Sequence, residues 1–383
     1  MCLQPDGSSC KITGTNEPNA REDKNMHIER ARRILNALDG LGARQMLITD
    51  PMSIFYLTDV YIQPFERFFG LLLRADGNHI LFLNRLFFVP QDVGIEKVWY
   101  SDTDAVTEIV AKYLDHNSPL AVDKDLTARH LLPLMEKKAA AAFINGSPAV
   151  DYTRGIKDAE EQKKMIAASE INDAAMAQFK TLIHDGVTEA EAAGKMLEIY
   201  RSLGAEGFSF SPLVAFGANA TDPHHEPDDT VIKPGDCVLF DVGCIKDGYC
   251  SDMTRTFYFK EVSEHCREIY HIVRRANEAA EALIRPGVRL CDIDAAARDL
   301  ITKEGYGPQF NHRLGHFIGL KEHEYGDVSS GFDWPVQPGM IFSIEPGIYL
   351  TGDTGVRIED LVLVTEDGVK ILNRYPHELE SIG

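Results

Sequence analysis

Residues 240–256 constrain the fold of this chain more than any other segment. Two strand-like runs flank the dipeptide Asp247–Gly248, which is a strong signal for a two-residue hairpin turn. A hairpin centred there pairs Asp241 with Thr254 and places Asp252 on the same sheet face as Asp241, because side chains alternate along a strand. Diagonal neighbours of this kind lie about 7 Å apart. The sequence therefore predicts two carboxylates that converge from adjacent strands.

Two neighbouring carboxylates in a protein interior are costly, since like charges disfavour joint ionisation and burial increases that cost. A bound divalent cation removes the cost, and this is the functional interpretation of Asp241 and Asp252. In the alternative interpretation, both are exposed acids on a solvated hairpin. The hairpin alone does not separate the two interpretations.

Three further stretches place polar residues in apolar surroundings. The stretch LGHFIGLKEHE carries His316 and His323, and IEPG carries Glu345 directly after an apolar strand. VRIED carries Arg357 and Glu359 among valine, isoleucine and leucine. Charged residues rarely enter such strands unpaired. A salt bridge between Arg357 and one of the acids is the structural interpretation, and charge at an active site is the functional one.

Together, these stretches contain five candidate metal ligands, which are Asp241, Asp252, His316, Glu345 and Glu359. Four hard oxygen ligands and one imidazole suit two closely spaced divalent cations of the Mn, Co, Fe or Zn kind. The set does not suit a structural zinc site, which favours thiolates.

The chain is long enough for two domains, because 383 residues exceed what one hydrophobic core usually holds. Residues 27–150 are expected to form a smaller α/β domain, with one of its strands at 54–57. A linker is expected near 146–154. Residues 155–383 are expected to form an α+β domain, in which helices cover an antiparallel sheet. Residues 1–26 lack the apolar stretch of a signal peptide and are expected to be a disordered tail.

Composition narrows the location and the partners. The net charge of −20 argues against nucleic acid or an anionic membrane as the main partner. The chain contains no run of 18 apolar residues, so no transmembrane helix is predicted. The seven cysteines are odd in number and contain no CxxC pair, which favours buried free thiols in a reducing compartment over a disulfide framework. We therefore expect a cytoplasmic protein that binds neither nucleic acid nor membrane.

In this order, the four stretches resemble the signature of the pita-bread metallopeptidases, which include methionine aminopeptidases, Xaa-Pro aminopeptidases and prolidases. The resemblance covers roughly Asp158–Gly383. The N-terminal part resembles the domain that accompanies the proline-specific and creatinase branch. The resemblance implies an α+β pita-bread catalytic domain with a smaller creatinase-like α/β domain before it. It also implies two divalent metal ions, with manganese as the first expectation, and a homodimer.

The resemblance assigns a role to each of the five ligands. Asp241 would bind one metal through both oxygens. Asp252 and Glu359 would bridge the two metals, and His316 and Glu345 would complete the coordination of the second. The chain does not depart from the five-ligand pattern of the family.

The resemblance also singles out His224, in the sequence ATDPHH, and His323, which flank the scissile bond in relatives. His225 stands beside His224 and is the alternative, although the Pro-His order favours His224. Glu345 is the candidate proton acceptor. Arg357 matches an arginine of the proline-specific branch.

The implied reaction is hydrolysis of the peptide bond preceding proline by a hydroxide that bridges the two metals. A pocket selects proline by shape, because its ring is fixed and it lacks an N–H. Phe208, Phe210 and Phe317 are candidate walls, with a place in the core as the alternative for each. Small proline-containing peptides are therefore the expected partners.

Three functions stay open at this point. An Xaa-Pro dipeptidase, or prolidase, is the first expectation, because the overall length and the stretch Tyr61–Leu73 resemble small bacterial prolidases. An Xaa-Pro aminopeptidase acting on longer peptides is the second. A non-catalytic binding protein that kept the fold is the third, and the presence of all five ligands disfavours it.

Overall fold

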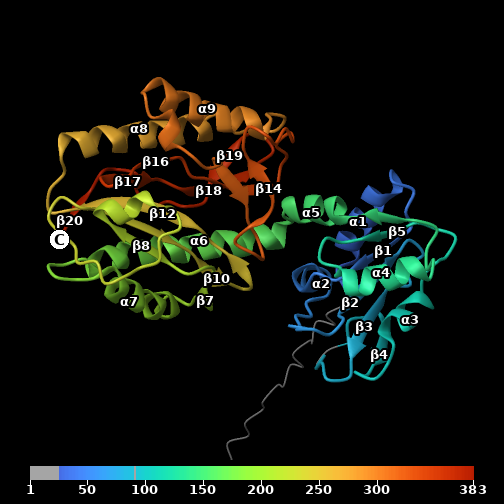
Figure 1. The fold of residues 1–383 in the computed structure, drawn as a ribbon. Helices are drawn as coiled ribbons and strands as arrows, with labels where there is room; N and C mark the ends of the chain where they lie inside the picture. Colours follow the sequence, from blue (N-terminus) through green and yellow to red (C-terminus); the bar gives the residue numbers. More distant parts are fainter. Residues whose placement is uncertain (1–25, 90–91) are drawn as a thin grey trace, which may run out of the picture.

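The computed structural model describes residues 26–89 and 92–383. The predicted tail at 1–26 lies outside this part, apart from Met26, which is buried. Figure 1 shows a smaller N-terminal domain beside a larger C-terminal domain. They are joined by α5 (Ser147–Gly155), which leads into the long α6 (Ala159–Phe179).

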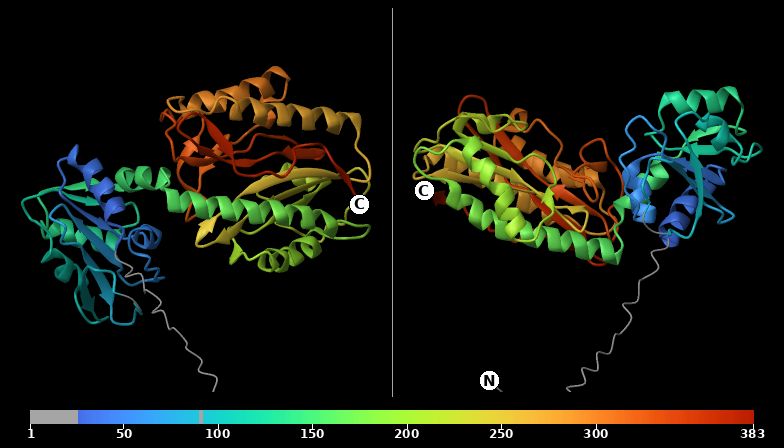
Figure 2. Two further views of the ribbon diagram at one scale, coloured as in Figure 1. Left: turned by 180° about the vertical axis from the view of Figure 1, so that it is seen from behind. Right: turned by 90° about the horizontal axis from the view of Figure 1, so that it is seen from below.

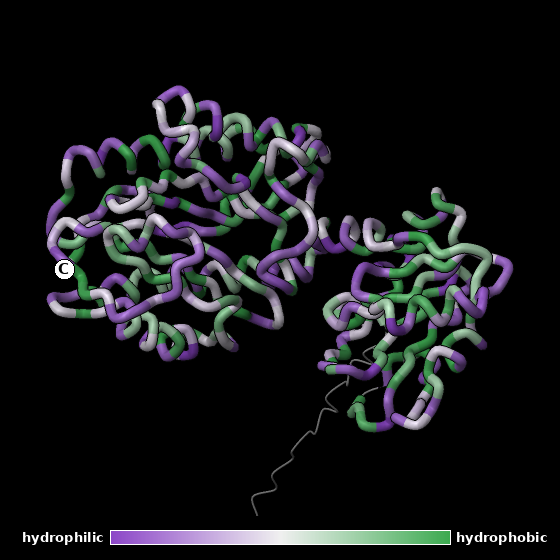
Figure 3. The backbone as a smooth tube through the Cα atoms, in the orientation of Figure 1, coloured by the Kyte–Doolittle hydropathy of each residue, from purple (hydrophilic) through white to green (hydrophobic). Residues whose placement is uncertain are grey.

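The N-terminal domain is built on a mixed six-stranded sheet with the spatial order β4-β3-β2-β1-β5-β6. Its strands are β1 (Gln45–Ile48), β2 (Gly70–Arg74), β3 (Ile80–Asn84), β4 (Glu96–Tyr100), β5 (Leu120–Val122) and β6 (Phe143–Asn145). Its helices are α1 (Ile28–Asp39), α2 (Pro51–Thr58), α3 (Val106–Ala111) and α4 (Ala128–Glu136). The strands are coloured largely as hydrophobic in Figure 3, and β1 to β3 are almost entirely buried.

One local prediction for this domain is wrong. The segment 54–57 is helical, as part of α2, and not a strand. Asp50 caps this helix by accepting two backbone N–H bonds, and Pro51 occupies its first position; both are helix-start signals. The helix is buried on several sides, so its apolar residues show no helical period. The expected linker at 146–154 does connect the two domains, and it takes the form of the helix α5.

The C-terminal domain has two pairs of helices. One pair is α6 with α7 (Glu189–Ser202), and the other is α8 (Glu264–Glu281) with α9 (Leu290–Lys303). In Figure 1 the pair α8 and α9 lies above the sheets and the pair α6 and α7 lies below them. Figure 2 shows α6 running along the whole domain from its junction with α5. Asp158 and Thr188 begin α6 and α7 with capping boxes, which satisfy the free N–H groups of the first turn.

Two sheets lie between the helix pairs, and both contribute to the site. The first has the order β20-β12-β9-β8 and the second has the order β14-β13-β15-β18-β19. The first contains β8 (Leu213–Phe216), β9 (Cys237–Val242), β12 (Met253–Phe259) and β20 (Ser381–Ile382). The second contains β13 (Gly315–Phe317), β14 (Glu324–Val328), β15 (Ile341–Ile344), β18 (Asp360–Val364) and β19 (Val369–Ile371).

Shorter elements complete the domain. They are β7 (Gly207–Phe208), β10 (Cys244–Lys246), β11 (Tyr249–Cys250), β16 (Gly347–Leu350), β17 (Thr354–Arg357) and the 3-10 turns η1 (Lys180–Leu182), η2 (Gly217–Thr221) and η3 (Gly307–Gln309). No helix in the described ranges is long and apolar enough to cross a membrane. The five cysteines of the described part are free thiols, and four of them are buried.

The hydrophobic core fixes each helix pair to the sheets. Ile269 and Val273 of α8 share a buried cluster with Phe342 of β15. Met176 of α6 shares another with Phe240 of β9. The strands that carry the candidate ligands are therefore held from behind by packed apolar side chains, which keeps their ends in fixed positions.

Candidate metal centre and substrate pocket

The predicted hairpin is present and has the predicted register. Asp247 and Gly248 both have positive φ angles, of 49° and 77°, as a type I′ turn requires. Thr254 lies directly opposite Asp241 in the ladder between β9 and β12. Asp252 lies just before β12, and both aspartates line the same pocket. The residues of the turn were therefore sufficient to predict that these two carboxylates lie close together.

The second sheet supplies the two glutamates. Ile344 of β15 pairs with Asp360 of β18. Glu345 directly follows the first of these residues and Glu359 directly precedes the second. Because the strands are antiparallel, both glutamates leave the sheet at the same edge, towards the pocket that they line.

His316 lies on β13, in the same sheet. Its backbone N–H donates to Ser343 Oγ over 3.0 Å, and its Nδ1 lies 3.2 Å from the carbonyl oxygen of Phe317. The Nδ1–H donated to that carbonyl leaves Nε2 as the lone-pair nitrogen. At Gly315 an added Cβ would lie 1.9 Å from the carbonyl oxygen of Ser343. Glycine at this position therefore allows the two strands to approach each other closely. The close approach places His316, the next residue, beside the pocket.

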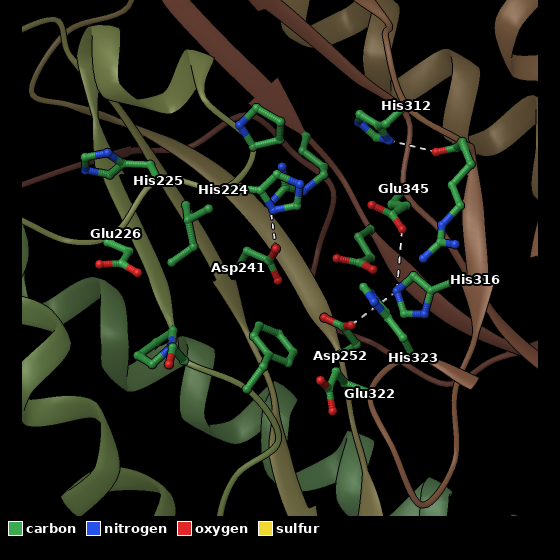
Figure 4. A pocket seen from close by; sticks show the side chains of 18 of the residues that line it. His224, His225, Glu226, Asp241, Asp252, His312, His316, Glu322, His323 and Glu345 are labelled. Atoms are coloured by element: carbon green, nitrogen blue, oxygen red, sulfur yellow. Dashed lines mark hydrogen bonds and ion pairs between the residues drawn. The ribbon is translucent and has the colours of Figure 1, made fainter. Parts of the chain in front are cut away.

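The five candidate ligands meet in one pocket of about 640 Å³. His316 Nε2 lies 3.6 Å from Asp252 Oδ2 and 3.5 Å from Glu345 Oε1, as Figure 4 shows. One ligand atom each from Asp252, His316 and Glu359 lies within 4.8 Å of the others. Asp241 lines the same pocket, so residues that are up to 118 positions apart between 241 and 359 converge on one point.

The buried carboxylates of this cluster repel one another, and a positive charge among them would remove that repulsion. Burial, followed by the charges of Glu359 and Asp241, raises the pKa of Asp252 well above its usual range. Burial, followed by the charge of Glu345, does the same to the pKa of Glu359, and burial raises the pKa of Glu345 to about 7. Asp241 Oδ1 and Asp252 Oδ1 are buried without a hydrogen-bond partner among the described residues. Orphaned carboxylate oxygens beside a free imidazole nitrogen fit divalent cations, so the residues present suit a metal centre.

Two family models match the chain. Metallopeptidase family M24 matches residues 163–366, and the Creatinase/Prolidase N-terminal domain matches residues 30–156. The chain belongs to metallopeptidase family M24. It is 38% identical to an uncharacterized peptidase of Staphylococcus aureus strain USA300, over 90% of this chain and 98% of the relative.

Two solved structures are similar over nearly the whole chain. Dipeptidase PepE from Mycobacterium ulcerans has a TM-score of 0.87 at 33% identity, covering 93% of this chain and 97% of that one. Xaa-Pro dipeptidase from Bacillus anthracis has a TM-score of 0.84 at 33% identity, covering 93% and 99%. The expected fold, a pita-bread catalytic domain preceded by a creatinase-like domain, is confirmed. This M24 protein is a metal-dependent peptidase.

Arg357 organises the ligands of the M24 site from behind. Its Nη2 donates to Asp241 Oδ2 over 2.5 Å, its Nη1 to the Tyr349 hydroxyl over 2.9 Å and its Nε to Thr254 Oγ1 over 3.0 Å. Thr254 in turn donates to Glu359 Oε2 over 2.6 Å. The salt bridge considered for Arg357 is therefore made, with Asp241, and it holds two ligands in position.

The three predicted histidine positions differ in environment. His323 lines the pocket, with its ring centroid 4.1 Å from that of His316, and burial lowers its pKa. His224 lines the pocket on an exposed segment. The Nε2 atom of His225 lies 2.6 Å from Glu189 Oε2. His225 is thus tied to α7, while the His224 side chain has no hydrogen bond within the described ranges.

The pocket is also lined by residues that the sequence motifs did not predict to lie at the site. Arg313 and Glu322 line it, and so does His312, whose Nε2 lies 2.9 Å from the Tyr349 hydroxyl. Arg313 directly precedes the LGH stretch, and this position next to a stretch that carries a ligand was the one sign in the sequence that it could lie at the site. Thr254 was predicted only as a strand partner, since a buried hydroxyl has no pattern of its own in a sequence.

Of the three aromatic candidates for the pocket wall, one lies at the pocket and two lie in the hydrophobic core. Phe210 lines the pocket. Phe317 is fully buried in the core against Phe342, and Phe208 packs on the ring of Tyr200 in the cluster of α6 and α7. One of the three candidates therefore faces the site.

Proposed function

We propose that this peptidase is an Xaa-Pro dipeptidase that hydrolyses the bond preceding proline with two bound divalent metal ions. The observation that carries the proposal is the convergence of Asp241, Asp252, His316, Glu345 and Glu359 in one pocket, with buried carboxylate oxygens left unpaired among the residues described. The similarity to an Xaa-Pro dipeptidase over nearly the whole chain supports the same proposal.

The proposed ligand roles follow the family pattern. Asp241 would hold one metal, Asp252 and Glu359 would be shared, and His316 and Glu345 would hold the other. When bound, the two ions would supply a nucleophile derived from water at neutral pH and would polarise the scissile carbonyl. Glu345 accepts a proton from the attacking water and passes it to the leaving nitrogen. Its Oε1 accepts a hydrogen bond from Ser343 Oγ over 3.2 Å, which orients the carboxylate for this transfer.

The two pocket histidines have separate roles in the proposal. His323 stands against the His316 ring and is placed to donate to the oxygen that becomes negative in the tetrahedral intermediate. His224 stands on the opposite side of the pocket (Figure 4) and orients the substrate backbone. Selection of proline falls to an apolar wall that contains Phe210, Pro212, Leu213, Pro223 and Pro227. Such a wall accepts a rigid ring without an N–H.

Arg313 favours a dipeptide over a longer substrate. Of the two arginines that line the pocket, Arg357 is buried and bonded to Thr254, Tyr349 and Asp241. Arg313 is 35% exposed and pairs through Nη1 with Asp327. Its Nε and Nη2 have no other hydrogen-bond partner among the residues described. We assign these donors to the carboxylate of the substrate proline, since a guanidinium binds a carboxylate with two parallel bonds.

The test compares alanyl-proline, alanyl-prolyl-alanine and alanyl-alanine with protein loaded with manganese. A dipeptidase hydrolyses the first and leaves the other two. R313Q is expected to raise the KM for alanyl-proline about tenfold, the scale of one charge-assisted hydrogen bond. R289Q is the matched control, because Arg289 pairs with Asp292 on the exposed surface. Efficient cleavage of the tripeptide would instead favour the Xaa-Pro aminopeptidase, and no cleavage by the loaded protein would favour a binding protein.

Three further parts of the proposal have their own measurements. Manganese as the native metal is tested by metal analysis of the purified protein. A homodimer is tested by light scattering coupled to size-exclusion chromatography. A cytoplasmic location, in keeping with the free thiols, is tested by cell fractionation.

A further inference from the structure

A second cluster of ligand-type residues lies beside the pocket and consists of Glu189, His225 and Asp228. Glu189 is fully buried at the first position of α7. Its Oε1 accepts from the backbone N–H of Phe216 over 2.6 Å and from Asn219 Nδ2 over 3.0 Å. Its Oε2 accepts from His225 Nε2 over 2.6 Å and from the backbone N–H of Asp228 over 3.2 Å.

These four donors decide against a second metal site. Both oxygens of Glu189 are fully occupied by N–H donors, and the Nε2 atom of His225 uses its proton in one of those bonds. The Glu189 oxygens and His225 Nε2, through which these residues meet, are therefore engaged with each other and with backbone N–H groups instead of facing a cation. The cluster has the residue types of a metal site, but its hydrogen bonds are those of a clamp. Burial raises the pKa of Glu189 above its usual value, and the hydrogen bond from His225 offsets part of that rise.

The clamp holds the segment 222–228, with the sequence DPHHEPD, against the catalytic domain. Pro223 and Pro227 have no backbone N–H to donate, and the segment forms no strand. Its bonds to α7 are the two to the Glu189 side chain and one from the Ala190 N–H to the Asp228 carbonyl. Its other bonds to the described chain are local: the Asp222 N–H donates to the Asn219 carbonyl, and the Thr230 N–H donates to Asp228 Oδ1.

The same segment forms one side of the substrate pocket. Five consecutive residues of it, 223–227, line the pocket, and His224 is among them. In the described part of the chain, the His224 side chain makes no hydrogen bond, and its backbone N–H bonds only within the segment, to Asp222 Oδ1 over 2.9 Å. Its position over the metal ligands therefore depends on how the next residue, His225, is held.

We propose that Glu189 is a positioning residue, which acts through His225 to hold His224 at the substrate. The proposal rests on the proposed function, because it takes His224 to contact the peptide. It differs in kind from the ligand assignments, since Glu189 does not itself line the pocket and reaches it through His225.

The decisive experiment is a double-mutant cycle between Glu189 and His224. E189Q keeps the volume and one acceptor oxygen but presents an N–H₂ to the donors of His225 and Asp228. It is expected to lower kcat/KM for alanyl-proline about tenfold, on the scale of one charge-assisted hydrogen bond. In the H224A background the same change is expected to cause no further loss, because coupled residues are not additive. An equal loss in both backgrounds would overturn the proposal.

Two matched variants separate positioning from general stability. E191Q alters a carboxylate in the same first turn of α7, which is exposed and bonds to the Thr188 N–H and not to the segment; it is expected to retain wild-type activity. H225Q retains an N–H donor for Glu189 and is expected to be more active than H225A. If E191Q loses as much activity as E189Q, the effect belongs to α7 as a whole and the clamp is refuted.

Hydrogen exchange gives a readout that does not depend on catalysis. Peptides spanning 222–228 are expected to exchange faster in E189Q than in the wild type or E191Q, because the Asp228 amide loses its acceptor. If the wild type does not hydrolyse proline peptides, the proposed function falls, and this measurement still decides the clamp. Equal exchange rates in E189Q and the wild type would refute it.

Discussion

Replacing Glu324 by glutamine tests the charge network that joins the two domains. Glu324 begins β14, directly after His323, and its side chain is 6% exposed. It pairs with Arg154 of α5 over 2.5 Å and with Lys157 over 3.3 Å. Arg154 also pairs with Asp50 of the N-terminal domain over 3.1 Å. A neutral residue at 324 therefore leaves two buried cations with one anion fewer.

The size of the effect follows from the pKa of Glu324. Although burial raises it, Arg154 and then Lys157 lower it from 4.5 to about 2. A difference of this size corresponds to about 3 kcal/mol of stability. Because the pKa is depressed in the folded protein, this contribution is complete above pH 4.5 and is lost as the pH falls towards 2. E324Q is therefore expected to unfold with a free energy about 3 kcal/mol lower at pH 7, and with almost no deficit near pH 2.

Urea unfolding of metal-free wild type and E324Q at a series of pH values between about 7 and 2.5 measures this difference. Other carboxylates titrate in both proteins, so their contributions cancel in the comparison. E160Q is the control, because Glu160 forms an exposed pair with Lys163, and such pairs contribute little. A deficit of E324Q that stays constant down to pH 3, or the absence of a deficit at pH 7, would refute the assignment of the low pKa to this network.

Three further predictions concern the metal centre. D252N is expected to abolish activity but to stabilise the metal-free protein by on the order of 1 kcal/mol, because it removes a carboxyl group whose ionised form is disfavoured by burial and by its acidic neighbours; an alanyl-proline assay and thermal unfolding in chelator measure the two effects. T254V is expected to weaken metal binding about 10- to 100-fold, since the Thr254 hydroxyl supports Glu359, as titration with manganese would show. G315A is expected to cost about 3 kcal/mol through a clash with the neighbouring strand. Gly331 has open space around it, so G331A is the control in the same unfolding assay.

The sequence predicted those parts of the structure that local chemistry determines. The register of the hairpin follows from Asp247–Gly248, because a two-residue turn allows one pairing of its strands. The residue pattern alone was therefore enough to place Asp241 and Asp252 together. Helices α6 and α7 also begin at local signals, because Asp158 and Thr188 form capping boxes with a glutamate three residues later.

The parts that the sequence did not predict depend on tertiary contacts. The segment 54–57 was assigned to a strand, because a short apolar run does not distinguish a buried helix from a buried strand. The start signal at Asp50–Pro51 does not decide between them, because Asp followed by Pro is typical of turns as well as of helix starts. Glu189 carries no local sign of its role, because the donors of its four hydrogen bonds come from residues 27 to 39 positions away.

The metal centre lies at the seam between the two sheets of the catalytic domain. The first sheet supplies Asp241 and Asp252, and the second supplies the other three ligands. Across the seam, the Glu359 backbone N–H donates to the Thr254 carbonyl over 3.1 Å, and Thr254 Oγ1 donates to the Glu359 carboxylate. Without cations, the mutual repulsion of the carboxylates opposes these bonds. Cations that bind ligands from both sheets would replace that repulsion with attraction, so metal binding should stabilise the folded domain as well as activate water, and a chelator should lower its melting temperature.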